Sequence, residues 1–226
     1  FQWSDGNASP GVLPKTVKIS DLYTIGRFGR AAYRLQKAAV IYRHGESAVI
    51  KQKNGRALYI YRAAKNLRVG MIYDMTVTSL ARFHGNLQIT AIDNPVSVAV
   101  LDKKERAAYY LYDPDTDLAD RSLSNEVIGQ MAGIYASGWF YYGSGRKIRV
   151  YFADSAGKPD TGGRVMIQHA RIGYFDDPRI IIEKKGQLKE FRHSEAVLSR
   201  DVALQNLAGA GSGRARRNGP VCPDPL

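Results

Sequence analysis

The stretch Ala39-Val40-Ile41-Tyr42-Arg43-His44-Gly45 returns later in the chain as Ala132-Gly133-Ile134-Tyr135-Ala136-Ser137-Gly138, beginning 93 residues further on (132 against 39). Two more segments repeat at nearly the same offset: residues 57–61 (ALYIY) match 148–152 (IRVYF), and residues 80–83 (LARF) match 172–175 (IGYF). Matches that arise by chance would not be expected to share nearly the same offset. A unit of this length exceeds the ~20–50 residues of solenoid and propeller repeats. The pattern therefore predicts one small β-rich domain used twice.

The first unit contains five segments with the composition and alternation of β-strands, at residues 33–42, 47–53, 56–62, 71–80 and 87–92. Asn54-Gly55 between the second and third predicts a β-hairpin with a type I′ turn. We expect one short helical turn near Ser20 and Asp21 and another in the connection at 63–69. Five strands with this break between the third and fourth indicate an OB-fold, a small and partly open Greek-key barrel.

The pattern around the fourth and fifth strands also resembles a known family. It consists of valine-glycine, a long strand, a small turn and leucine-glutamine-isoleucine, carried by Val69, Gly70, Leu80, Phe83, Gly85, Leu87, Gln88 and Ile89. In this respect residues 19–95 resemble the OB-fold nucleic-acid-binding-like domains of secreted bacterial nucleases and surface proteins. The resemblance implies an OB barrel and assigns no catalytic residue. A degenerate second copy is expected at about 125–190.

The second unit is less regular than the first. Strands are predicted at 126–135, 147–153, 164–174 and 179–185, with an aromatic turn region at 138–145 and an open loop at 154–163. The predicted fold is thus all-β: two tandem OB-like five-stranded barrels, the second degenerate, with short connecting helices. The predicted divisions are an N-terminal arm (1–18), barrel one (19–100), a linker (101–124), barrel two (125–192), and a short helix at 194–207 within a basic flexible tail (193–226).

Composition favours a partner that carries negative charge. Thirty-three Lys and Arg against 21 Asp and Glu give a net charge of +12, which attracts nucleic acid, an anionic membrane or polysaccharide, or an acidic protein. The alternative is that the basic residues are simply spread over the surface. Cys222 is the only cysteine, so neither an intrachain disulfide nor a cysteine zinc site is expected. The sequence lacks the long apolar run of a transmembrane helix, and its start at Phe1 leaves a removed signal peptide and export from a bacterium open.

No motif of an enzyme or of a metal site is complete. Asp113, Asp115 and Asp117 have the spacing that opens an EF-hand loop, but the sixth and twelfth positions are Leu118 and Ser124. The four histidines, His44, His84, His169 and His193, stand without carboxylates at motif spacing. Nucleophile elbows, phosphate-binding loops and metalloprotease helices are missing as well. The sequence therefore predicts no catalytic residue, no metal and no cofactor, and a solvated acidic linker at 113–117.

Aromatic and basic side chains interleave on the predicted second and third strands, where OB-folds take their ligands. Alternation places Tyr59 and Tyr61 on the face opposite Leu58 and Ile60, which are the better core residues. Single-strand binders need both kinds of side chain, because cations meet phosphates and rings stack on bases. The predicted ligand-binding residues are Lys51, Lys53, Arg56, Tyr59, Tyr61, Arg62, Arg82 and Phe83.

Two functions fit these patterns. The first is a non-enzymatic binding or structural protein that uses its OB scaffold to hold a protein partner within a larger assembly. The second is single-stranded nucleic-acid binding through the basic and aromatic face. The sequence identifies neither the partner nor the oligomeric state, and it leaves a homo-oligomer open.

Overall fold

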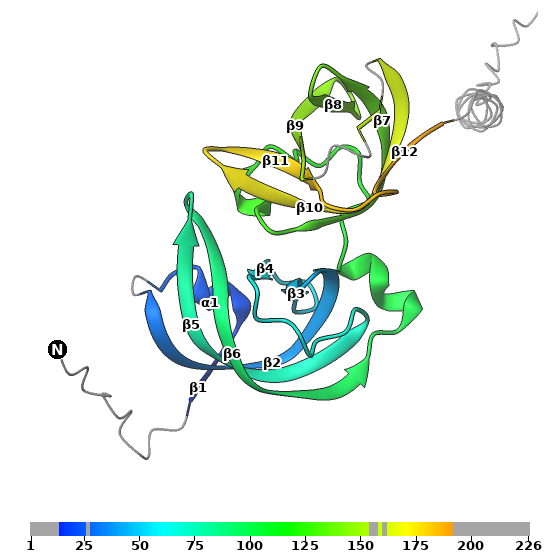
Figure 1. Cartoon of the computed structure of the whole chain (residues 1–226). Helices are drawn as coiled ribbons and strands as arrows, with labels where there is room; N and C mark the ends of the chain where they lie inside the picture. The colour runs from blue at the N-terminus through cyan, green and yellow to red at the C-terminus, as the bar shows by residue number, and fades with distance from the viewer. Residues whose placement is uncertain (1–13, 26–27, 154–157, 160–161, 192–226) are drawn as a thin grey trace, which may run out of the picture. The chain divides into compact units, whose positions relative to one another are not determined.

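The computed structural model of the chain describes residues 14–25, 28–153, 158–159 and 162–191. These residues are mostly β-strand (Figure 1). The first sheet contains β1 (Lys15–Val17), β2 (Gly29–His44), β3 (Ser47–Lys51), β4 (Ala57–Ile60), β5 (Met71–Phe83) and β6 (Asn86–Val100). The second contains β7 (Val127–Ala136), β8 (Trp139–Tyr142), β9 (Arg146–Phe152), β10 (Gly163–Phe175), β11 (Asp177–Ile182) and β12 (Leu188–Glu190). The described helices are α1 (Ile19–Leu22) and the 3-10 helices η1 (Lys103–Ala108) and η2 (Arg121–Leu123).

The first sheet closes into a five-stranded barrel. Its strands pair in the order β2-β3-β4-β6-β5, and β5 pairs again with β2. The β4–β6 pair is parallel and the other four are antiparallel. β2 can serve both neighbours because its register shifts between Leu35 and Ala38 and again between Val40 and Tyr42. Such bulges bend a strand and increase its twist, which lets a long strand turn the corner of a barrel.

The second sheet repeats this topology strand for strand. Its order is β7-β8-β9-β11-β10, β10 pairs again with β7, and the parallel pair is β9–β11. The sequence repeats fall on corresponding strands: 39–45 and 132–138 end β2 and β7, 57–61 and 148–152 lie on β4 and β9, and 80–83 and 172–175 end β5 and β10. The prediction of two tandem OB-like barrels is confirmed.

Three local predictions need correction. Residues 63–69 form turns and no helix, since the Ala64 N–H is held across the chain by the Glu46 carbonyl. Residues 138–145 include the strand β8, in which Phe140 and Tyr142 are buried and Trp139 and Tyr141 alternate with them. The β3–β4 hairpin is present, but its loop runs from residue 52 to 56 and only Asn54 of the Asn-Gly pair has positive φ. The loop is therefore longer than a type I′ turn.

Each barrel has its own hydrophobic core. Leu35, Leu58, Ile60 and Leu80 are among the fully or almost fully buried residues of the first. The second core includes Phe140, Ile167 and Ile172, and it takes in Leu118 from the segment between the sheets. Leu58 and Ile60 thus face inward and Tyr59 and Tyr61 face outward, as alternation along β4 predicts. The predicted helix at 194–207 and the basic tail lie outside the described residues.

Buried polar groups join the two sheets. Lys51 Nζ lies 2.6 Å from Glu126 Oε2, and Glu126 Oε1 accepts the Ala57 N–H at 2.9 Å. Asn125, which is fully buried, donates to the Tyr23 hydroxyl and the Leu87 carbonyl. All described residues up to Glu190 accordingly belong to one compact unit, and the boundaries at 19–100 and 125–192 stay a prediction.

The Lys51–Glu126 pair generates a prediction about stability. Lys51→Met or Glu126→Gln leaves the other charge buried without its partner, so each should lower the free energy of unfolding by about 3–5 kcal/mol. The double variant should recover much of this loss, because no buried charge remains. The urea midpoint of unfolding measures the effect.

Lys53→Met is the matched control, since Lys53 forms its ion pair with Glu105 at an exposed position. Its midpoint should stay close to that of the wild type. Single variants that behave like this control would contradict a stabilising role for the buried pair.

Candidate functional site

The predicted ligand-binding residues lie on two separate surfaces. Tyr59, Tyr61 and Phe83 line one cavity, while Lys51, Lys53 and Arg56 line a second hollow beside α1 and the β3–β4 loop. Arg62 and Arg82 are exposed, and each places its guanidinium over an aromatic ring. The structure therefore keeps the aromatic part of the predicted face together and separates Lys51, Lys53 and Arg56 from it.

In the second hollow, the predicted cations are largely engaged by other protein groups. Lys51 is buried against Glu126, and Lys53 pairs with Glu105 at 2.7 Å. The Arg56 guanidinium stacks on Tyr23, 3.6 Å from the ring centroid. Burial raises the pKa of Tyr23 to about 12, so its hydroxyl stays protonated at neutral pH. Lys51 is thus a structural residue of the junction between the sheets and not part of a ligand site.

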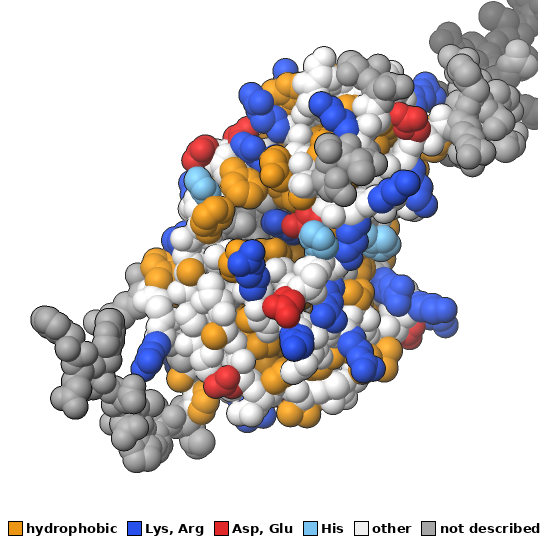
Figure 2. Space-filling view, in the orientation of Figure 1, with side chains coloured by type: hydrophobic (Ala, Val, Ile, Leu, Met, Phe, Trp, Pro, Cys, Tyr) orange, Lys and Arg blue, Asp and Glu red, His pale blue; other side chains and the backbone are white. Residues whose placement is uncertain are grey.

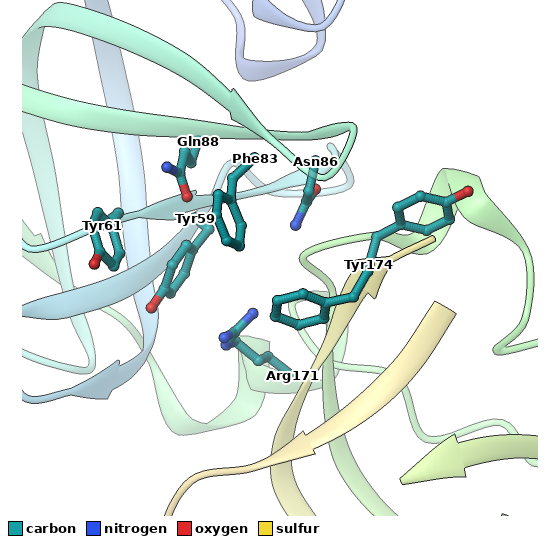
Figure 3. A pocket seen from close by; sticks show the side chains of 8 residues that line it. Tyr59, Tyr61, Phe83, Asn86, Gln88, Arg171 and Tyr174 are labelled. Carbon is teal, nitrogen blue, oxygen red and sulfur yellow. The ribbon is translucent and has the colours of Figure 1, made fainter. Parts of the chain in front are cut away.

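The aromatic cavity lies where the two sheets meet, and we call it the junction cavity. Its volume is about 200 Å³. Figure 3 shows the side chains that line it. The first sheet contributes residues of β4 and of the β5–β6 hairpin, and the second contributes residues of β10. The lining residues are Tyr59, Tyr61, Phe83, Asn86, Gln88, Arg171, Tyr174 and Phe175.

Strand alternation explains how the first sheet supplies its share. On β6, Leu87 and Ile89 point into the core, which turns Asn86 and Gln88 to the outer face. Gln88 is in register with Tyr59 of β4, so the two outer faces are continuous. Phe83, at the end of β5, is 52% exposed.

The second sheet contributes a buried cation. Arg171 donates from Nε and Nη2 to Glu183 Oε1, at 3.2 and 2.9 Å. Glu183 also accepts the Tyr42 hydroxyl at 2.7 Å. Burial alone would raise the pKa of Glu183, but the Arg171 charge and the hydrogen bonds from Arg171 and Tyr42 outweigh it, and the net pKa is lowered. The carboxylate thus fixes Arg171 with its guanidinium 4.4 Å from the centroid of the Tyr59 ring.

Each of the three cavity tyrosines carries an arginine over its ring. Besides Arg171 on Tyr59, Arg62 lies 5.1 Å from the Tyr61 centroid and Arg121 lies 4.5 Å from the Tyr174 centroid. In the described part of the chain, neither Arg62 nor Arg121 forms an ion pair with a carboxylate. Figure 2 shows lysine and arginine side chains spread among hydrophobic ones on the face it presents. The cavity therefore combines aromatic faces with cations free to meet an anion.

Sequence reasoning missed five of the cavity residues: Asn86, Gln88, Arg171, Tyr174 and Phe175. The signal that could have found two of them was the internal repeat, because Tyr174 and Phe175 at the end of β10 match the predicted Arg82 and Phe83 at the end of β5. The Phe83 and Phe175 rings meet edge to face with centroids 6.0 Å apart. Arg171 and the two amides carry no such signal, since their roles depend on how the sheets pack.

The described residues contain no group of three His, Cys, Asp or Glu side chains that could hold a metal ion. At the EF-hand-like spacing, Asp113 and Asp117 accept backbone N–H groups two residues further on, and Asp115 faces Arg146. These carboxylates organise turns. No helix among the described residues has the length and apolar composition to cross a membrane.

No family model and no curated protein matches this chain. The solved structures similar to it include the p204 HINb domain, with 10% identity, a TM-score of 0.39 and coverage of 74% of this chain and 100% of that one. The Ifi202 HINa domain in complex with 20-bp dsDNA has 9% identity, a TM-score of 0.34 and coverage of 74% and 98%. Fission yeast Pot1 with ssDNA has 11% identity, a TM-score of 0.32 and coverage of 80% and 90%. None of these three is a bacterial nuclease or surface protein, and similarity at this level supports no inference about function.

The lowered pKa of Glu183 predicts how stability depends on pH. Its ionised form stabilises the fold fully above the ordinary pKa of 4.5, and this contribution is lost as pH falls through the lower folded-state pKa. Glu183→Gln should therefore be less stable than the wild type near neutral pH and should lose less stability on acidification. Urea midpoints at about pH 7 and about pH 3 test this.

Glu46→Gln, at an exposed position, serves as the control and should leave the pH curve in place. Parallel curves for Glu183→Gln and the wild type would show that the Glu183 carboxylate does not contribute in this way.

Proposed function

We propose that the protein is a non-enzymatic binder of single-stranded nucleic acid and that the junction cavity with its surrounding arginines is the contact surface. The observation that carries the proposal is the set of five aromatic rings from two sheets around one cavity, four of them overlaid by arginines. The proposed site keeps Tyr59, Tyr61, Arg62, Arg82 and Phe83 of the sequence prediction. It adds Arg121, Arg171, Tyr174 and Phe175.

Two exposed rings at this cavity are open to a ligand. Tyr61 and Phe83 leave 39% and 52% of their surface open there. A nucleobase can stack on such a ring because it presents a flat π-face, and each stacked base contributes ~1–3 kcal/mol.

The charge of the chain supports an anionic ligand of this type. A net charge of +12 attracts a polyphosphate backbone at long range. At short range, Arg62 and Arg121 lie next to the rings on which bases would stack. We propose a single strand as the ligand because bases inside a duplex cannot reach aromatic side chains without leaving the stack.

The stacking component is tested by Tyr61→Ala combined with Phe83→Ala. Loss of two rings should raise the Kd for an oligothymidylate of about 12 nucleotides at least about tenfold. Fluorescence anisotropy of a labelled oligonucleotide gives the Kd. Tyr141→Ala removes a ring of similar exposure on β8, outside the cavity, and should leave the Kd unchanged.

The phosphate component is tested by Arg62→Ala combined with Arg121→Ala. Each phosphate contact on a single strand contributes about 0.7 to the slope of log K against log salt, so the loss of two contacts should flatten the slope by about 1.4. The weakening should be the same for every base sequence. Wild-type affinity and slope in both double variants would refute the site.

The other candidate function, holding a protein partner, is favoured by a separate surface. Val96, Val98 and Val100 on β6 are exposed to 59%, 49% and 70%. A protein contact centred on such residues would depend little on salt, whereas nucleic-acid binding weakens steeply as salt rises. The link to secreted bacterial proteins, and with it export, stays a prediction from the sequence.

A further inference from the structure

A cluster of aromatic and basic side chains on the second barrel is not used by the proposed site. It lies on the outer face of β8 and β9, where outward residues alternate with the buried Phe140 and Ile148. Trp139 of β8 is in register with Arg149 of β9. The Arg149 guanidinium lies 4.7 Å from the centroid of the Trp139 ring, and Lys147 Nζ lies 4.9 Å from it. The indole is therefore in contact with two cations from the neighbouring strand.

Tyr151 connects this cluster to the junction cavity. It stands two residues after Arg149 on β9 and therefore shares its outward face, with 47% of its surface exposed. Its ring centroid lies 6.1 Å from that of Phe175, which lines the cavity. Rings thus follow one another from the cavity onto the second barrel. We call the set of Trp139, Lys147, Arg149 and Tyr151 the β8–β9 platform.

A carboxylate lies between two arginines at the edge of this platform. Arg149 Nε is 3.0 Å from Asp177 Oδ2, and Arg179 donates to Asp177 Oδ1. Arg179 is the register partner of Arg149 in the parallel β9–β11 pair, and its guanidinium lies 5.4 Å from the Phe175 centroid. The Asp177 side chain is 41% exposed, so these ion pairs are open to solvent. A phosphate offers guanidinium groups the same kind of charged oxygen acceptors as a carboxylate.

We propose that the β8–β9 platform is a second contact surface for the nucleic-acid strand. Beyond the junction cavity, bases would stack on Tyr151 and Trp139. One backbone phosphate would take the place of the Asp177 carboxylate between Arg149 and Arg179. In the free protein, Asp177 thus competes with the ligand for two arginines. This inference rests on the proposed function and extends its contact surface.

The charge of the platform and of its edge favours a phosphate backbone. Lys147, Arg149 and Arg179 carry positive charge, and Asp177 is the carboxylate paired with the two arginines. In the described part of the chain Lys147 forms no ion pair, so it is free to meet a phosphate. Tyr141, the next outward ring of β8, has no cation over it among the described residues, so the platform ends before it.

Asp177→Asn provides the sharpest test, because it removes the competing charge and keeps the shape of the side chain. The Kd for an oligothymidylate of about 12 nucleotides should fall about fivefold, since two arginines become available to phosphate. The slope of log K against log salt should steepen by about 0.7, the value for one contact on a single strand. If Asp177 only positioned the arginines, its loss would weaken binding instead. Asp93→Asn, at an exposed position on β6, changes the net charge by the same amount and should leave the Kd within about twofold.

Two further variants test the ring and the unpaired cation. Trp139→Ala should raise the Kd at least about fivefold, because one stacked base is lost. Lys147→Ala should flatten the salt slope by about 0.7. As controls, Tyr112→Ala removes a 44% exposed ring outside the platform, and Lys189→Ala removes an exposed lysine on β12. Both controls should keep the wild-type Kd and slope.

Urea midpoints show whether each variant is folded. Unchanged or weaker binding in Asp177→Asn, or a wild-type Kd in Trp139→Ala, overturns the platform when the midpoint is unchanged. Lys147 is exposed, so the salt slope of Lys147→Ala decides the question if either midpoint shifts. These results leave the proposed function standing as long as Tyr61→Ala combined with Phe83→Ala weakens binding. Failure of the wild type to bind the oligonucleotide would refute the proposed function and the platform together.

Discussion

The buried polar contacts between the two sheets fix the arrangement of the two barrels, and the junction cavity depends on that arrangement. Glu126 satisfies both Lys51 Nζ and the Ala57 N–H across the junction, and Asn125 links Tyr23, Asn86 and Leu87. Buried charges and amides tolerate little displacement, because each lost partner leaves a desolvated group. The two barrels are thereby held in one arrangement, and the cavity between them has fixed walls.

A second set of contacts extends this constraint into the proposed site. Tyr42 of the first sheet donates to Glu183 of the second, and Glu183 in turn holds Arg171 beside Tyr59. The same carboxylate therefore joins the sheets and orients the cation of the cavity. The aromatic walls follow from the duplication of the fold, since Phe83 and Phe175 come from matching strand ends and meet at the junction. A surface that neither barrel has alone is formed by the pair.

The sequence predicted what local patterns control. Alternation along β4 gave the inward Leu58 and Ile60 and the outward tyrosines, and the weak repeat located corresponding strands in the two barrels. The sequence did not predict that Lys51 is buried. Its burial depends on an ion pair with Glu126, which lies 75 residues away in the chain. Arg171 was missed for the same reason. Its role comes from Glu183 and Tyr59, and contacts between the sheets leave no periodic signal.

Mapping where a single strand touches the protein tests most directly whether the junction cavity is the contact surface. The full chain can be photo-cross-linked to a labelled oligonucleotide and the modified residues identified by mass spectrometry. We predict cross-links at Tyr61 or Phe83 of the first sheet and at Tyr174 or Phe175 of the second, in the same complex. Cross-links confined to one sheet, or to the hollow lined by Lys53 and Arg56, would contradict this prediction.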